Sequence, residues 1–424
     1  MGPGGQTSLF APEPALDPLL CWLWLAHVMG PASSHAGRVL DAFGGAQEAW
    51  EARDTQEFRQ AAGLAAAKRA GQLTPEQYQG LADRCRALGV RILPFDDPDY
   101  PLAFSRIPDM PLVLYCTGDP VWLNEPGTVG IVGSRKPTDY GLQAAADIGE
   151  ALARSGALIV SGLADGLDSA GHRAAVKNGC PTIGILGVPI DRTYPAANVA
   201  LRHTIEQNGC ILSEYAPGES TPGPVGFLQR NRLIAALSSA LLVVEAREKS
   251  GTMSTVSHAE RYGKPVFAVP GSIYSPDSAG TNRLLHEGRA RAACSGADLV
   301  QALGLQASAA PEAEIRQPDP TQPPGDPSAP GTQLPPPEVP GNPPHPEPGS
   351  APQAGVPMTD GTPAACRQKN AQEFLAGKVP GVMAQYAPGL FSTLQHAHSA
   401  HPAPDEDADA VQQLVEWREN APYG

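Results

Sequence analysis

The feature of the sequence that most constrains its fold is a regular alternation of two kinds of segment between residues 128 and 303. Six short apolar runs recur there, and helix-like segments separate them. Uninterrupted apolar runs of this length are typical of strands buried on both faces of a sheet. The six runs are Val129–Val132, Ala157–Ser161, Thr182–Leu186, Cys210–Ser213, Leu241–Glu245 and Pro265–Val269. The alternation predicts an α/β fold with a mostly parallel sheet, helices on both faces, and ligand loops at the carboxyl ends of the strands.

The segments before this alternation differ from it in composition. Residues 1–16 are rich in glycine and proline, and we expect them to be disordered. Residues 17–90 predict short helices, which form either a plain helical packing domain or a helix-hairpin-helix-like domain that touches DNA phosphates through backbone N–H groups. Residues 90–126 read as strand, turn and strand, so the main domain is predicted to run from 91 to 303.

The segments after it are predicted to lie outside the packed core. Residues 311–363 hold 18 of the 46 prolines, so 304–363 is interpreted as a proline-rich linker. Residues 364–424 form an acidic C-terminal segment with a cluster at 405–409 that leads into a short predicted helix. No activity is predicted for this segment.

Charge is unevenly distributed along the chain, whose net charge is −14. Residues 127–303 hold 16 Lys/Arg against 15 Asp/Glu, whereas residues 304–424 hold 5 against 14. A polyanion site is therefore expected in the middle of the chain, and the acidic tail is expected to compete with a polyanion for it. The seven scattered cysteines form no CxxC pair, which predicts neither disulfides nor a metal site and favours a reducing cytoplasm. The apolar run at 19–26 is too short to span a membrane.

The first strand is followed by a loop with the composition of an anion site. Gly133 permits a tight turn, Ser134 can bind an oxyanion, and Arg135 offers a bidentate fork for phosphate, with Lys136 adding general attraction. A dinucleotide site is the competing interpretation. The spacing is not G-x-G-x-x-G, and the second strand ends without an acid to hold a ribose. NAD binding is therefore disfavoured, and no cofactor is expected.

Two later loops supply further candidates. Gly162 permits close backbone approach after the second strand, where Asp168 is best interpreted as a helix cap and His172 as a packing residue. Tyr194 and Asn198 belong to the third loop. Tyr194 either stacks on a nucleic acid base or is a half-buried turn aromatic, and these two interpretations are evenly weighted.

The segment from 227 to 255 carries the remaining candidates. Arg230, Asn231 and Arg232 precede the fifth apolar run, and the two arginines are expected to contact phosphates. Glu214 and Glu245 are acids at strand ends that could orient those arginines. Small residues that let backbone N–H groups approach a phosphate follow the run. They are Ser250, Gly251 and Thr252, with Lys249 just ahead of them.

Taken together, the loops resemble the DprA (Smf) family. The residues that carry the resemblance are GSR at 133–135, SGLADGLDSAGH at 161–172, YPAAN at 194–198, SEYAPG at 213–218, FLQRNRLIAAL at 227–237, VVEAREKSGTMST at 243–255 and VFAVPGSIYSPDSAGTNRLLHEG at 266–288. The similarity is close in the central domain and looser over 17–90. Many family members end in a winged-helix domain, whose pattern is not recognised in residues 364–424.

The resemblance implies an extended Rossmann-like domain and a DNA-binding protein that is not an enzyme. Family members bind incoming single-stranded DNA in natural transformation, counter single-strand-binding protein, load the RecA recombinase and form homodimers. Their basic DNA pocket is centred on the GSR loop, here Gly133, Ser134 and Arg135. The runner-up is a nucleotide phosphoribohydrolase of the lysine-decarboxylase-like fold. Those enzymes show PGGxGTxxE after a late strand, whereas residues 250–255 lack both the glycine pair and the acid.

Overall fold

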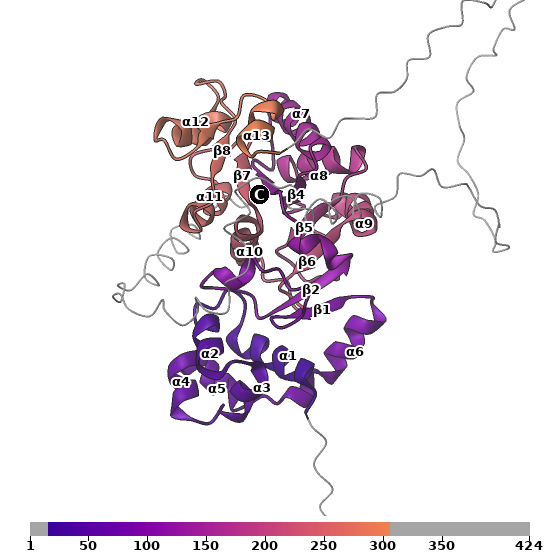
Figure 1. The fold of residues 1–424 in the computed structure, drawn as a ribbon, viewed down its shortest axis with the longest axis vertical. Coiled ribbons are helices and arrows are strands. Elements are labelled where there is room, and N and C mark those ends of the chain that lie inside the picture. The colour runs from indigo at the N-terminus through magenta and orange to yellow at the C-terminus, as the bar shows by residue number, and fades with distance from the viewer. Residues whose placement is uncertain (1–15, 306–424) are drawn as a thin grey trace, which may run out of the picture. The chain divides into compact units, whose positions relative to one another are not determined.

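The structure is a computed structural model that describes residues 16–305. Its centre is a nine-stranded sheet with the strand order β1-β2-β6-β5-β4-β3-β7-β8-β9 (Figure 1). The strands are β1 (Arg91–Pro94), β2 (Val113–Gly118), β3 (Thr128–Val132), β4 (Leu158–Ser161), β5 (Thr182–Leu186), β6 (Cys210–Ser213), β7 (Ala240–Val243), β8 (Val266–Ala268) and β9 (Arg291–Ala292). All six predicted strands are present, which confirms the predicted α/β fold.

The sheet is parallel from β6 to β9 and antiparallel at its other edge. β1 pairs with β2, and β2 pairs with β6 in the register Tyr115↔Ser213. The strand-turn-strand segment predicted over 90–126 therefore extends the main sheet by two strands. The two-residue strand β9 was not predicted, because a run this short and exposed has no apolar signature.

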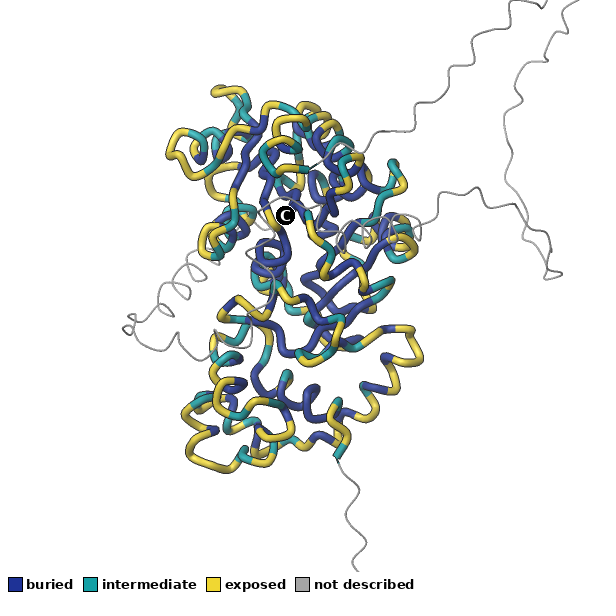
Figure 2. The backbone as a smooth tube through the Cα atoms, viewed as in Figure 1, coloured by how far each residue is buried: buried dark blue, intermediate teal, exposed yellow. Residues whose placement is uncertain are grey.

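Successive side chains of the central strands point to two hydrophobic cores, one on each face. Ile159 belongs to one core, whereas its neighbours Leu158 and Val160 belong to the other. The first core is covered by α7 (Asp139–Arg154), α8 (Leu167–Lys177) and α13 (Gly296–Ala302), and the second by α10 (Pro224–Leu237) and α11 (Thr252–Arg261). Figure 2 shows the central strands as buried along their length, as the continuous apolar runs require. The remaining helices of this part are α9 (Val199–Asn208) and α12 (Ala279–His286).

The helices predicted over 17–90 are also present. They are α1 (Pro18–Met29), α2 (Ala36–Phe43), α3 (Ala46–Glu51), α4 (Gln56–Ala62), α5 (Leu64–Ala70) and α6 (Gln79–Ala87). The Asp17 carboxylate accepts a hydrogen bond from the Leu19 N–H at 2.9 Å, which caps α1 at a proline in its first turn. α1 is apolar and buried on all sides, and its residues pack in the same core as Val113 and Leu114 of β2.

Several sequence predictions lie outside the described residues. These are the disordered N-terminus up to residue 15, the proline-rich linker beyond residue 305 and the acidic C-terminal segment. Within residues 16–305 the helices are too short or too polar to cross a bilayer.

Candidate nucleic-acid interface

The loop after β3 is held in place by hydrogen bonds from its own backbone. The Ser134 N–H donates to the Glu245 carbonyl oxygen at 2.8 Å, and the Ser134 carbonyl accepts from the Leu167 N–H at 3.2 Å. The Lys136 N–H donates to Ser134 Oγ at 3.1 Å. Two of the loop's N–H groups are therefore already used, which leaves the exposed side chains of Arg135 and Lys136 as its outward-facing donors.

Gly133 is required by close packing rather than by its backbone angles. A Cβ atom at this position would lie 2.8 Å from the Glu245 carbonyl oxygen and would also collide with the Leu167 side chain. The loop therefore passes through a narrow gap between the end of β7 and the start of α8. This gap fixes the direction in which Arg135 leaves the sheet.

Arg135 begins a row of three exposed or half-exposed side chains. Its guanidinium carbon lies 4.9 Å from the centre of the Phe227 ring, and that ring lies 5.2 Å from the ring of Tyr194. Phe227 is in the first turn of α10, and because α10 leads into the parallel strand β7, this turn lies at the carboxyl edge of the sheet. We call Arg135, Phe227 and Tyr194 the edge row. The structure thus supports an exposed position for Tyr194, which is 51% accessible.

Arg230 is buried beneath this edge. Its Nη1 donates to the Ile185 carbonyl oxygen at 2.5 Å, and its side chain fills the space beside Gly162, where a Cβ atom would collide with the guanidinium. Burial lowers the pKa of Arg230 to about 10, although the nearby Asp168 carboxylate acts against that change. Burial also raises the pKa of Asp168, against the effect of Arg230. Only 4% of Arg230 is exposed, so it lies below the surface as a buried cation, contrary to its predicted role as a phosphate contact.

Arg232 is placed in the interior, contrary to its predicted role as a phosphate contact. Its guanidinium lies 2.8 Å from a Glu214 oxygen and 3.4 Å from an Asp109 oxygen, with 1% of the residue exposed. Burial alone would lower the pKa of Arg232, but the two carboxylates outweigh it and raise the pKa. An arginine sealed between two acids cannot reach a ligand, so Arg232 is a structural ion pair. The expectation that Glu214 orients one of these arginines is confirmed.

Gly162 and Asn198 also have internal partners in place of a ligand. The Gly162 N–H donates to the Asp168 carboxylate at 3.1 Å. The Asn198 amide donates to the Leu163 carbonyl at 3.0 Å and to Ser169 Oγ at 2.9 Å, and the residue is 2% exposed. Gly162 and Asn198 therefore hold the loop after β4 in place instead of making the predicted contacts.

The loop after β7 is tied to the loop after β3. Thr252 Oγ1 donates to the Gly133 carbonyl at 3.2 Å, and the Asn231 amide donates to the Gly251 carbonyl at 3.2 Å. Thr252 is the first residue of α11, so its neighbours Ser250 and Gly251 stand at the start of that helix. Ser250 Oγ is buried and has no hydrogen-bond partner within the described part of the chain. Lys249 is exposed at the same loop.

His172 is unsuited to acid–base chemistry. It is fully buried, with Nδ1 at 2.8 Å from Thr182 Oγ1. Burial lowers the pKa of His172 to about 3, and the charge of Arg230 acts in the same direction. The side chain is therefore neutral at neutral pH, as the packing interpretation predicts.

Sequence reasoning missed two parts of this edge. Phe227 opens the FLQRNR segment, but only the folded position of α10 brings its ring beside Arg135. Glu245 was expected to orient Arg230 or Arg232 and instead accepts hydrogen bonds from Thr138 at 2.9 and 2.6 Å. The sequence signal available for Phe227 is an aromatic residue three positions before an arginine in the same predicted helix. No local pattern links residues 138 and 245.

Comparison with known proteins gives one consistent result. The family model described as DNA recombination-mediator protein A matches residues 91–304. The DNA processing protein DprA of Bacillus subtilis is 36% identical over 235 residues, which cover 55% of this chain and 76% of that protein. DprA of Streptococcus pneumoniae is 40% identical over 204 residues, covering 48% of this chain and 71% of that protein. The X-ray structure of Streptococcus pneumoniae DprA superposes with a TM-score of 0.56 at 30% identity, covering 66% of this chain and 97% of that one.

Proposed function

This chain belongs to the DNA recombination-mediator protein A family, that is, the DprA (Smf) proteins, and from this premise we propose that it binds single-stranded DNA at the edge row. The observation that carries the proposal is the row formed by the exposed Arg135 guanidinium, the half-exposed Phe227 ring and the exposed Tyr194 ring. Proteins that hold unpaired strands combine a cationic track for phosphates with aromatic surfaces for bases. The edge row supplies both within one continuous surface.

The roles of the individual residues follow from their exposure. Arg135 pairs with a phosphate through its fork of donors, and Lys136 and Lys249 add attraction without fixed geometry. Phe227 and Tyr194 stack on successive bases, which requires no particular sequence. Ser250, Gly251 and Thr252 offer the start of α11 to a neighbouring phosphate. These groups are held in place by hydrogen bonds of Ser134 and Asn231 and by the close packing at Gly133.

The wider role rests on the family. We propose that the protein acts in natural transformation in the cytoplasm, protecting incoming DNA, countering single-strand-binding protein and loading the RecA recombinase as a homodimer. The proposal includes no catalytic activity. The phosphoribohydrolase alternative is not favoured, because the loop after β7 lacks the acid of PGGxGTxxE and His172 is buried and neutral.

A mobility shift with a labelled single-stranded oligonucleotide tests the proposal. We expect Arg135→Ala to weaken binding by at least about tenfold, the loss of one charge-assisted contact. The matched control is Arg154→Ala, which removes an exposed arginine of α7 that pairs with Glu150 away from the edge row. The site would have to be sought elsewhere if both variants shifted the oligonucleotide as the wild type does. Release of free base from nucleoside monophosphates would instead favour the hydrolase.

A further inference from the structure

A cavity opens at the position where open α/β sheets usually hold small ligands. The strand order changes direction between β3 and β7, because the chain runs from β3 to β4 and β5 on one side and reaches β7 on the other. A crevice outside the carboxyl ends of the strands at such a switch point is the general ligand site of these folds. Here it holds about 510 Å³, within the range of about 300–1,000 Å³ usual for small-molecule sites.

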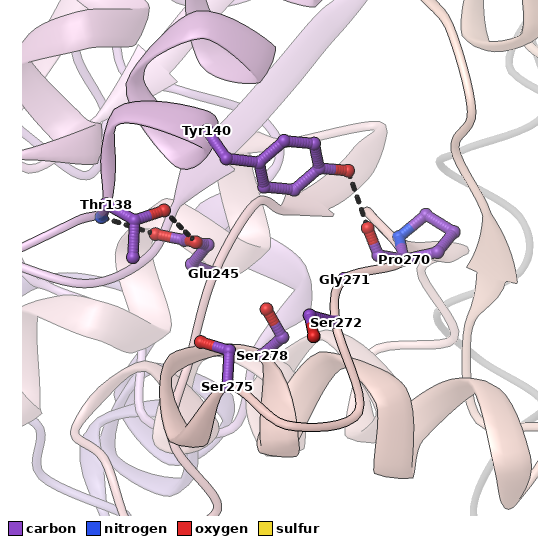
Figure 3. Close-up of a pocket in the computed structure, with 8 residues that line it drawn as sticks. All are labelled: Thr138, Tyr140, Glu245, Pro270, Gly271, Ser272, Ser275 and Ser278. Atoms are coloured by element: carbon purple, nitrogen blue, oxygen red, sulfur yellow. Dashed lines mark hydrogen bonds between the residues drawn. The ribbon is translucent and has the colours of Figure 1, made fainter.

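The carboxylate of Glu245 stands in the wall of this cavity, at the N-terminus of α7 (Figure 3). Its Oε2 accepts from the Thr138 N–H at 2.9 Å, and its Oε1 accepts from the Thr138 hydroxyl at 2.6 Å. Thr138 is the N-cap of α7, and its Oγ1 accepts in turn from the Gly141 N–H at 3.2 Å. The Glu245 carboxylate therefore accepts a hydrogen bond from a backbone N–H at the start of α7, and it also holds the side chain that caps this helix.

The charge of this carboxylate is well buried, since Glu245 is only 1% exposed. Its oxygens accept hydrogen bonds from the Thr138 amide and hydroxyl, next to the first turn of a 16-residue helix. The partial positive charge at a helix N-terminus favours an anion at this position. Glu245 is thus an anion supplied by the protein itself.

In nucleotide-binding α/β folds this position belongs to the ligand. The pyrophosphate of a dinucleotide lies at the N-terminus of the helix that follows the first strand, because that end offers N–H groups and positive potential. α7 is that helix here. A phosphate placed there would compete for the same donors and would face a buried carboxylate of the same sign at close range, which is strongly repulsive where water is excluded.

Glu245 also holds the loop that carries Arg135. Its carbonyl oxygen accepts from the Ser134 N–H at 2.8 Å, so its backbone fixes one end of the loop while its side chain fixes Thr138 at the other end. Glu245 is packed tightly against both ends of this loop. A Cβ atom on Gly141 would collide with the Glu245 carboxylate, and a Cβ atom on Gly133 would lie 2.8 Å from its carbonyl oxygen.

We infer that Glu245 is a built-in anion that takes the place of a ligand phosphate at the N-terminus of α7. It keeps nucleotide phosphates out of the switch-point cavity, and it is the positioning residue that sets the loop so that Arg135 points outward to the edge row. Folds of this type commonly bind dinucleotide phosphates in this cavity. In this protein the proposed phosphate contacts lie instead on the outer side of the loop after β3. The positioning part of this inference rests on the proposed function, whereas the exclusion part does not.

The exclusion part is tested without DNA, by equilibrium dialysis with labelled inorganic phosphate and with AMP. We expect Glu245→Ala, which removes the internal anion and leaves its space, to gain a saturable site for these probes that the wild type lacks. Glu150→Gln is the matched control. It neutralises a carboxylate of α7 that pairs with Arg154 and Lys177 at the surface, and it should gain no such site. A Glu245→Ala protein that binds neither probe overturns the inference.

The positioning part is tested by oligonucleotide affinity. We expect Glu245→Gln, which keeps the volume and loses the charge, to bind about tenfold more weakly, as when one charge-assisted contact is misplaced. Gly141→Ala displaces the carboxylate and should cause a similar loss. Combining Gly141→Ala with Glu245→Ala should weaken binding no further than Glu245→Ala does, because no carboxylate remains to be displaced.

The outcomes separate this inference from the proposed function. Wild-type oligonucleotide affinity in Glu245→Gln, with Arg135→Ala impaired, overturns the positioning role and leaves the edge row in place. If Arg135→Ala binds normally, the proposed function fails, and the phosphate dialysis alone decides whether Glu245 excludes anions. Should Glu245→Ala fail to fold by circular dichroism, Glu245→Ser carries the dialysis, because it also removes the carboxylate and leaves its space, and Glu245→Gln still measures the positioning role.

Discussion

The loop after β3 and the middle of α10 both present arginine beside polar neighbours, and the structure uses them in opposite ways. Arg135 is exposed and lies over the Phe227 ring at 4.9 Å. Arg232 is 1% exposed and lies between Glu214 and Asp109. The loop ends at the edge of the sheet, whereas α10 is packed between the sheet and its neighbours. An arginine therefore reaches a ligand only when its element brings it to an edge, whatever its local sequence suggests.

The largest expected effect is on stability, at the buried member of this comparison. Arg232→Ala leaves Glu214 and Asp109 without their cation in a water-poor site, so we expect it to lower the free energy of unfolding by about 3–5 kcal/mol. Urea unfolding followed by circular dichroism measures this. Arg154→Ala, at an exposed pair on α7, should change it by less than about 0.5 kcal/mol. Similar stability in the two variants would remove the distinction between buried and exposed arginines.

Arg135, the exposed arginine of this comparison, should affect binding much more than stability. Arg135→Ala should leave the free energy of unfolding nearly unchanged and reduce the free energy of oligonucleotide binding by about 1.5–3 kcal/mol, the range for a hydrogen bond to a charged group. Because binding to phosphate releases counterions, the slope of log affinity against log salt should also become shallower by about 0.7 for one lost single-strand contact. A weaker but equally salt-dependent complex would mean that Arg135 does not meet a phosphate.

The interior should also respond to acid, through the buried side chain of His172. The pKa of His172 is lowered from 6.5 to about 3 when folded, chiefly by burial, so the unfolded chain takes up a proton below pH 6.5 that the folded chain refuses until about pH 3. Stability therefore falls as the pH falls through this window, by about 2 kcal/mol between pH 7 and pH 5. The raised pKa of Asp168 acts in the opposite direction.

Urea unfolding at the two pH values measures the effect of His172. The same measurement on His172→Gln, which cannot take up the proton, should show a smaller loss between pH 7 and pH 5. Equal losses in the two proteins would assign the acid sensitivity to other groups.

Phe227→Leu is expected to act on binding by a smaller amount. Leucine keeps the apolar contact at the start of α10 and loses the aromatic surface, so we expect about 1 kcal/mol less binding free energy, the lower end of the range for stacking on one base. Oligonucleotides of thymine and of adenine should both be affected, because stacking is tolerant of sequence. An effect confined to one base would indicate hydrogen-bonded recognition in place of stacking.

Most of the fold could be predicted from the sequence because its strands are buried on both faces. Runs such as Ala240–Val243 are apolar throughout, and they stand out against the polar segments between them. The antiparallel pairing of β2 with β6 could not be predicted. It joins Tyr115 to Ser213, almost one hundred residues apart, and no local pattern encodes such a pair.

The site was harder to predict, because exposure in the folded chain decides which polar groups are available. Arg135 and Tyr194 are exposed at the edge, whereas Arg232 and Asn198 have polar side chains that satisfy interior partners. In a sequence the two kinds look alike. The pairing of Glu245 with Thr138 shows the same limit, since a carboxylate at a strand end can serve a ligand or the protein itself.

The smallest expected effect concerns the acidic chain beyond residue 305, for which only the sequence gives evidence. Residues 304–424 carry 5 Lys/Arg against 14 Asp/Glu, so their charge has the same sign as DNA and is attracted to the same cationic edge. Deleting residues 306–424 should tighten oligonucleotide binding by a few-fold at low salt. The gain should vanish near 0.5 M salt, because the screening length there falls below about 5 Å. Unchanged affinity at low salt would show that the tail does not compete, and a gain that persists in high salt would point to a contact that is not electrostatic.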